Sequence, residues 1–171
     1  MSYSPVPRFS FRDVTDISPG FLNMNGIRFL MVDLDNTIAS YDEHAPTGPI
    51  IRWTEEIKAS GVKLLIVSNS RREGRVEAFA QALGIGFIKS ARKPSPHGVL
   101  HAMLSEGYTT DESALLGDQI YTDALAANRA GVISIAVRPR SIRNPLLAAR
   151  YALESPFRAA ARKQSQRLRQ Q

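Results

Sequence analysis

Apolar runs and amphipathic segments alternate along the first 140 residues of the chain. The apolar runs predict buried strands at 27–35, 62–70, 85–90, 113–118 and 132–137. Segments with helical periodicity lie between and after them, at 50–61, 73–84, 95–107 and 120–131. Runs that are apolar throughout are typical of strands covered on both faces. The pattern therefore predicts an α/β fold, a three-layer sandwich around a mostly parallel five-stranded sheet.

The two ends of the chain depart from this alternation. Residues 1–25 have a mixed character, with a turn signal at 18–20, and we expect them to pack on the domain. The domain itself, which carries the candidate site, is expected to span residues 26–140. Residues 141–171 are expected to form a basic helical tail with a disordered end.

Two dipeptides in the tail, Asn144-Pro145 and Ser155-Pro156, are each typical of a helix start. An apolar stripe is expected along the tail, formed by Leu146, Leu147, Tyr151 and Leu153. We favour a helix that packs on the domain, and adhesion to anionic lipid is the alternative. Contact with nucleic acid is a weaker alternative, because the tail lacks interleaved aromatic residues.

Composition narrows the classes of function. The chain has 171 residues, enough for one domain with a sizeable core, and it contains no cysteine. Disulfides, thiolate metal sites and a cysteine nucleophile are therefore excluded. The three histidines are too scattered for a histidine metal cage, and we expect His97 and His101 to be surface or packing residues rather than metal ligands. Trp53 is expected in the core.

Neither a secretory signal nor an apolar stretch of the roughly 20 residues that span a membrane is found in the sequence. We therefore expect a cytoplasmic protein, with peripheral contact to the inner face of the membrane as an open alternative. The net charge of +6 is uneven. From Arg138 onward nine Lys/Arg and one acid, Glu154, give +8, whereas residues 1–137 carry −2.

Polar residues follow three of the predicted strands at the point where each strand ends. Asp33 and Asp35 end the first, Ser68 and Asn69 the second, and Asp118 the fourth. In open α/β sheets ligands bind outside the carboxyl ends of the strands, so these residues form one site if their strands are neighbours. Carboxylate ligands without histidine or cysteine favour Mg²⁺ over zinc, and the ion would neutralise the repelling charges.

The remaining polar groups of this set suit a phosphoryl group. Ser68 and Asn69 offer a hydroxyl and amide donors, and Lys93, just before a predicted helix, offers a positive charge. Phosphoryl transfer depends mainly on neutralising charge and on positioning. A carboxylate can also act as the nucleophile and form an aspartyl-phosphate.

Four sequence motifs in this order resemble those of the haloacid dehalogenase (HAD) phosphatase superfamily. They are "DLDNT" at 33–37, "VSNS" at 67–70, Lys93 in "ARKP", and "GDQIYTD" at 117–123. More narrowly, the motifs resemble subfamily IIIA and its YqeG-like branch, which is similar to phosphatidylglycerophosphate phosphatase. The likeness covers about residues 10–140 and implies a HAD-like Rossmannoid fold.

The resemblance implies a role for each acid. Asp33 would be the nucleophile that takes the phosphoryl group. Asp35 would act as general acid for the leaving oxygen and then as the base that activates water. Asp33, Asp35 and Asp118 would hold Mg²⁺, Asp35 through its backbone carbonyl and Asp118 as a direct ligand.

The other motif residues would bind or support. Ser68 would donate a hydrogen bond to the phosphoryl oxygens, with Asn69 beside it. Lys93 would stabilise the charge on the phosphoryl group and on the nucleophile. Thr37 would support its loop, and Asp123 would lie farther out, orienting a metal-bound water or Lys93.

The gaps between the motifs are too short for a separate cap domain. About thirty residues separate the first two motifs and about twenty-three lie between Ser70 and Lys93, and predicted helices and strands fill most of both. The resemblance implies that members of this superfamily with small substrates usually carry a cap domain, which excludes water from the site. A site without a cap is open, and it therefore suits a phosphate carried on a lipid, a protein or a nucleic acid end.

These inferences favour an Mg²⁺-dependent phosphomonoester hydrolase acting on a large substrate such as phosphatidylglycerophosphate. A receiver-like signalling module, which keeps a phosphoryl group on aspartate, is the first alternative, and Asp35 argues against it because a nearby acid can activate water. A nucleic-acid-binding or scaffold protein with a vestigial site is the second. The sequence leaves the physiological substrate and the oligomeric state open.

Overall fold

One parallel sheet organises the protein. The structure, a computed structural model, describes residues 4–168, with side chains described as far as Lys163. Within these residues six strands follow the spatial order β1-β6-β5-β2-β3-β4, and every neighbouring pair is parallel. The strands are β1 Phe9–Ser10, β2 Phe29–Val32, β3 Lys63–Val67, β4 Gly86–Ile88, β5 Ser113–Gly117 and β6 Ile133–Ala136. The α/β fold is confirmed.

The sheet has one strand more than the five predicted from the sequence. The additional strand, β1, pairs Phe9 with Ile135 and Ser10 with Ala136 at the edge of the sheet. It has only two residues, too few to produce an apolar run. A 3₁₀ turn, η1 (Val14–Asp16), and helix α1 (Pro19–Met24) connect it to β2.

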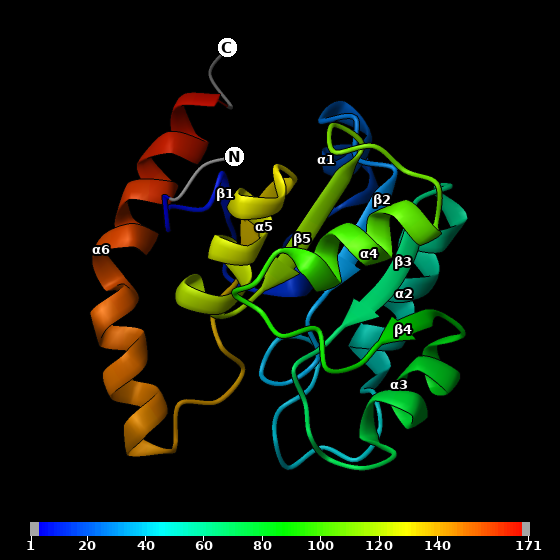
Figure 1. The fold of residues 1–171 in the computed structure, drawn as a ribbon. Coiled ribbons are helices and arrows are strands. Elements are labelled where there is room, and N and C mark those ends of the chain that lie inside the picture. The colour runs from blue at the N-terminus through cyan, green and yellow to red at the C-terminus, as the bar shows by residue number, and fades with distance from the viewer. Residues whose placement is uncertain (1–3, 169–171) are drawn as a thin grey trace.

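Helices cover both faces of the sheet (Figure 1). On one face α2 (Gly48–Ala59) and α3 (Arg75–Leu83) pack over Leu30, Val32 and Ile66. On the other face α4 (His97–Ser105) and α5 (Leu125–Ala130) pack over Phe29, Met31 and Leu65. No separate cap domain interrupts residues 4–168, because loops alone join β2 to α2 and β3 to α3.

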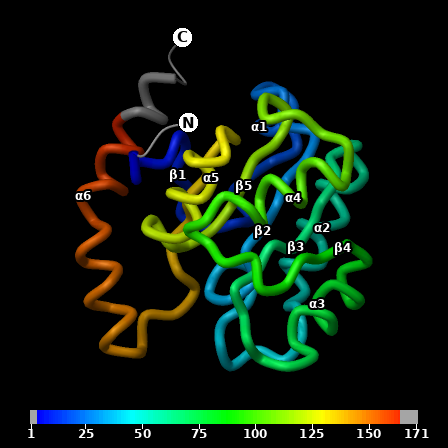
Figure 2. Tube along the Cα trace, viewed as in Figure 1, coloured from blue at the N-terminus to red at the C-terminus, as the bar shows by residue number. Residues whose placement is uncertain are grey.

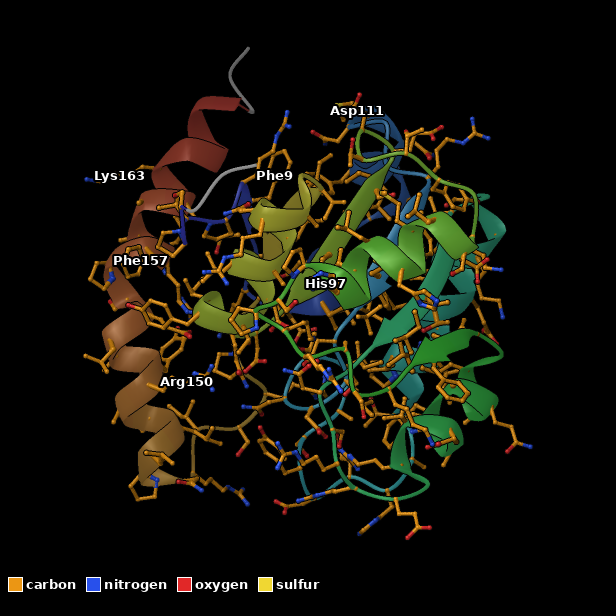
Figure 3. All side chains as sticks on the ribbon, in the orientation of Figure 1. Phe9, His97, Asp111, Arg150, Phe157 and Lys163 are labelled. Carbon is orange, nitrogen blue, oxygen red and sulfur yellow. The ribbon has the colours of Figure 1, made fainter. Side chains whose placement is uncertain are left out.

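Two sequence-based interpretations of single side chains are confirmed. Trp53 is a core residue, 4% exposed, and its indole N–H donates to the carbonyl of Ile17 at 2.9 Å. His97 and His101 are exposed on α4, and Figure 3 labels His97 near the start of that helix.

A long helix, α6 (Pro145–Leu168), runs beside the β1 edge of the sheet (Figure 2). The second helix start, predicted at Ser155-Pro156, is wrong, because Pro156 lies inside this single helix. Helix α6 continues through Pro156 even though proline removes one backbone hydrogen bond there. No helix in the described part of the chain is long and apolar enough to cross a bilayer. The expected disorder at the end of the tail concerns residues outside those described.

The apolar stripe predicted along the tail is also wrong. Leu146 and Leu153 are 77% and 70% exposed, whereas Leu147 and Tyr151 are half-buried. Leu146 and Leu153, seven residues apart, share the outer face of the helix, and the other two lie on the inner face. Among the side chains of α6 that are described, as far as Lys163, the buried ones are Glu154, Arg158 and Ala161. Polar contacts therefore attach much of this helix to the domain.

Candidate active site

The carboxyl ends of three adjacent strands meet at one edge of the sheet. Strand β2 lies between β5 and β3, and Val32 pairs with Leu116 on one side and Ile66 on the other. The residues that follow these strands therefore converge, as the sequence-based argument required. A pocket at this edge is lined by Asp33, Asp35, Tyr41, Ser68, Asn69, Ser70, Lys93, Gln119, Thr122 and Asp123.

Lys93 lies at the centre of the site. Its ammonium group is within 2.6 Å of a carboxylate oxygen of Asp33 and within 2.6 Å of one of Asp123, and its side chain is 1% exposed. The Asn69 amide fixes the backbone of Lys93: it donates to the Lys93 carbonyl at 2.8 Å and accepts from the Lys93 N–H at 2.9 Å. Burial lowers the pKa of Lys93, but the Asp123 and Asp33 charges outweigh it and leave the pKa above its ordinary value.

Three buried carboxylates gather around this lysine. Asp33, Asp118 and Asp123 each place one oxygen within 4.8 Å of the others. The Thr37 hydroxyl lies 3.1 Å from an Asp33 oxygen and 3.2 Å from an Asp118 oxygen, and it accepts the Asp118 N–H at 3.0 Å. With all three acids ionised, the cluster and Lys93 together carry a charge of −2. A divalent cation with hard oxygen ligands would balance that charge, so these residues fit Mg²⁺.

The pKa values of two of these acids are raised by burial and by the same excess of negative charge. Burial raises the pKa of Asp33 to about 6, with Lys93 opposing the shift and Asp123 adding to it. Burial, together with the charges of Asp123 and Asp33, raises the pKa of Asp118 well above its ordinary value. Both pKa values are raised because the carboxylates are buried away from water and lie close to other negative charges.

Asp123 serves Lys93 and its own loop. One of its oxygens contacts Lys93, and the other accepts the Gln119 N–H at 3.0 Å. Asp123 lies in η2 (Ile120–Ala124), a π-helical turn at the start of the helix predicted over 120–131. Such turns are frequent at functional sites. A side chain on Gly117 would collide with the Asp123 carboxyl group, so glycine is required for this close approach.

The side chain of Asp35 lies apart from the three-carboxylate cluster. One of its oxygens accepts from Nε of Arg75 at 2.8 Å. Arg75 also donates to the carbonyls of Ser40, at 2.8 Å, and Glu43. Arg75 therefore fixes both Asp35 and the loop that follows it. The sequence assigned Asp33, Asp35 and Asp118 to the metal. Asp33 and Asp118 are members of the cluster, and the third carboxylate in it comes from Asp123.

Ser68 is fully buried at the end of β3, and its hydroxyl accepts the Ser70 N–H at 3.0 Å.

Sequence reasoning missed Arg75, because an arginine in a helix pattern usually indicates solvent exposure. It also missed a buried pair on α6, Glu154 and Arg158. The available signal was that Glu154 is the only acid in the basic tail and lies four residues before an arginine.

The comparisons with known proteins agree with this fold. The haloacid dehalogenase-like hydrolase family matches residues 17–131, and the chain belongs to this family. It is a phosphatase: it is 37% identical to "Probable phosphatase YqeG" of Bacillus subtilis (strain 168) over 134 residues, covering 78% of this chain and 77% of that protein. The match assigns the chain to the hydrolases and argues against the receiver-like alternative.

A second relative is more distant. The chain is 26% identical to "Phosphatidylglycerophosphate phosphatase 1, chloroplastic/mitochondrial" of Arabidopsis thaliana, covering 80% of this chain and 41% of that protein. Among solved structures, 3-deoxy-D-manno-octulosonate 8-phosphate phosphatase of Moraxella catarrhalis superposes with a TM-score of 0.50 at 16% identity, covering 81% of this chain and 94% of that one. That similarity supports the fold.

Gly117→Ala tests the close packing behind Asp123. The new methyl group should displace Asp123 and with it Lys93, and a displacement of about 1 Å in such a site costs on the order of 10²-fold in kcat. The measurement is steady-state hydrolysis of an aryl phosphate. Gly20→Ala, at an exposed position with room for a side chain, is the matched control. Unchanged kcat in the Gly117 variant would contradict this account.

Asp118→Asn tests the charge balance, because removing one buried negative charge should raise the thermal stability of the metal-free protein. A raised pKa means that the fold disfavours the ionised form, so stability falls as pH rises from the ordinary value of 3.8 towards the raised one. Above that window, in EDTA, the variant should melt about 3 °C or more above the wild type. The gain should shrink near pH 4, and Mg²⁺ should stabilise only the wild type. Thermal melts that show the variant less stable in EDTA at pH 8 would refute this reasoning.

Proposed function

We propose that the protein is an Mg²⁺-dependent phosphomonoester hydrolase that works through an aspartyl-phosphate on Asp33. The observation that carries the proposal is the burial of the Lys93 ammonium between Asp33 and Asp123, with Asp118 in the same cluster. This arrangement places positive charge beside a carboxylate that also lines a pocket. Neutralised charge and a positioned carboxylate are what a phosphoryl transfer to aspartate requires.

In the first step an Asp33 oxygen attacks phosphorus, the phosphorus–oxygen ester bond breaks, and Asp35 gives its proton to the leaving oxygen. In the second step Asp35 takes a proton from water, which attacks phosphorus and releases inorganic phosphate and the Asp33 carboxylate. Lys93 and the Ser68 hydroxyl stabilise the phosphoryl oxygens. Asp33 and Asp118 would hold Mg²⁺, which would supply positive charge to balance the developing negative charge.

We further propose that the substrate is a phosphate on a large carrier, with phosphatidylglycerophosphate as the first candidate. Loops and the turn η2 line the pocket, and no cap domain is present within the described residues. Asn36 follows the catalytic aspartates, and its amide exchanges two 2.8 Å hydrogen bonds with Ser141. Ile142 and Leu146, 49% and 77% exposed, lie just beyond that contact. The named Arabidopsis relative supports the same class of substrate.

Arginines lie near these exposed apolar residues in the sequence, at positions 138, 140, 143 and 150. Basic and apolar side chains together suit the surface of an anionic membrane. We therefore propose a cytoplasmic enzyme in peripheral contact with the inner face of the membrane. Nucleic acid is a weaker partner, because the two aromatic residues of the tail, Tyr151 and Phe157, are half-buried against the domain.

Asp33→Asn tests the nucleophile. An amide cannot form the acyl-phosphate, so kcat on an aryl phosphate with Mg²⁺ should fall by at least about 10³-fold. Asp111→Asn, at an exposed acid labelled in Figure 3 before the start of β5, should leave activity unchanged. EDTA should abolish wild-type activity. Retained turnover by a folded Asp33 variant would reject the assignment.

Hydrolysis of a phospholipid substrate in vesicles tests the proposal that the phosphate is carried on a lipid. Ile142→Glu with Leu146→Glu should lower hydrolysis of phosphatidylglycerophosphate in anionic vesicles about tenfold, because two added negative charges weaken membrane binding. Hydrolysis of a soluble aryl phosphate should not change. Leu104→Glu, on exposed α4, is the matched control. Equal losses on both substrates, or no loss on vesicles, would contradict membrane contact at this surface.

A further inference from the structure

Helix α6 lies outside the residues that match the family, yet it contacts the back of the active site. Its inner face carries two charged side chains, Glu154 and Arg158, that are 2% and 3% exposed. They are four residues apart and form an ion pair of 2.8 Å. Outside this inner face charged side chains are exposed at Arg162 and at Lys163, which points away from the domain (Figure 3).

Arg158 connects three parts of the protein. Its guanidinium donates to Glu154, to the Val137 carbonyl at 2.8 Å and to the Asp118 carbonyl. Val137 directly follows β6, and Asp118 directly follows β5. The guanidinium carbon lies over the Tyr151 ring, 4.8 Å from its centroid. One side chain of α6 thus holds the ends of two neighbouring strands.

Glu154 secures the next residues of the same loop. One carboxylate oxygen accepts the Ile120 N–H at 3.0 Å, and the other accepts from Arg158. Arg150 lies 3.6 Å away as a second, partly exposed cation. The pair therefore contacts the loop on both sides of Gln119, between Asp118 and η2.

A buried ion pair is poorly explained by stability alone. Removing two charges from water costs several kcal/mol per ion, and well-packed apolar residues in such places are often as stable or more so. What the pair supplies here is geometry. The Asp118 N–H bonds to Thr37 and the Asp118 carbonyl to Arg158, so both flanking peptide groups are fixed. Fixing both restricts the backbone that aims the Asp118 carboxylate.

We propose that Arg158, braced by Glu154, is a positioning residue that holds Asp118 in the direction required for binding Mg²⁺. Helix α6 is then part of the metal site as well as a covering element. This inference rests on the proposed function. Supporting groups behind metal ligands typically change metal affinity by about 10- to 100-fold when they are removed.

The decisive variant replaces both charges, Arg158→Met with Glu154→Leu. Because neither charge is left unpaired in the interior, the fold should survive, as circular dichroism and thermal melting can show. Titration calorimetry of Mg²⁺ should give a dissociation constant at least about tenfold above that of the wild type. The Mg²⁺ concentration for half-maximal hydrolysis of an aryl phosphate should rise in parallel.

Arg162→Met is the matched control, because this arginine is one turn further along α6 and exposed. It should bind Mg²⁺ as the wild type does. If the double variant does not fold, Arg158→Lys decides in its place: it keeps the charge beside Glu154 but loses the planar fork, and should also weaken Mg²⁺ binding.

Unchanged Mg²⁺ affinity in the folded variant would overturn the inference while leaving the proposed function intact. A wild-type protein that binds no Mg²⁺ would overturn both. The two failures are therefore distinguishable in one set of titrations.

Discussion

The active site depends on one buried ammonium group. Lys93 is enclosed by Asp33 and Asp123, each 2.6 Å away, and Asp118 completes an acidic cluster around it. One lysine cannot balance three carboxylates, and burial makes the remaining repulsion costly. A divalent cation is the simplest addition that balances the set. The same charge then favours a phosphoryl group whose negative oxygens need positive neighbours.

The polar ends of the strands were predictable because a parallel sheet has one carboxyl edge. A single acid directly after an apolar run, such as Asp33 or Asp118, is commonly a helix cap or a turn residue, and the recurrence of polar residues at several strand ends indicated the site. The fold followed from the same runs, except for β1, whose two residues pair through backbone groups that leave no pattern in the sequence. Side-chain partners were harder to predict. Arg75 was not identified as a site residue, because its burial depends on where Asp35 and the loop at 40–43 lie in space.

The tail illustrates why composition alone misleads. The sequence favoured a helix packed on the domain and placed its leucines and Tyr151 in one apolar stripe. Glu154 and Arg158 are buried instead, because backbone groups at the ends of β5 and β6 provide partners for them. Leu146 and Leu153 remain on the outer face. Helix α6 therefore has an inner face with polar contacts to the residues that follow β5 and β6, and an outer face with exposed leucines where we propose contact with a membrane.

The central claim is that Asp33 accepts a phosphoryl group beside an ion bound by Asp33 and Asp118. A crystal structure of the protein with Mg²⁺ and beryllofluoride, which mimics a phosphoryl group on aspartate, tests it most directly. The account predicts beryllofluoride bonded to Asp33, contacted by Lys93 and Ser68, with Mg²⁺ between Asp33 and Asp118. Beryllofluoride on another residue, or an ion bound away from Asp118, would contradict it.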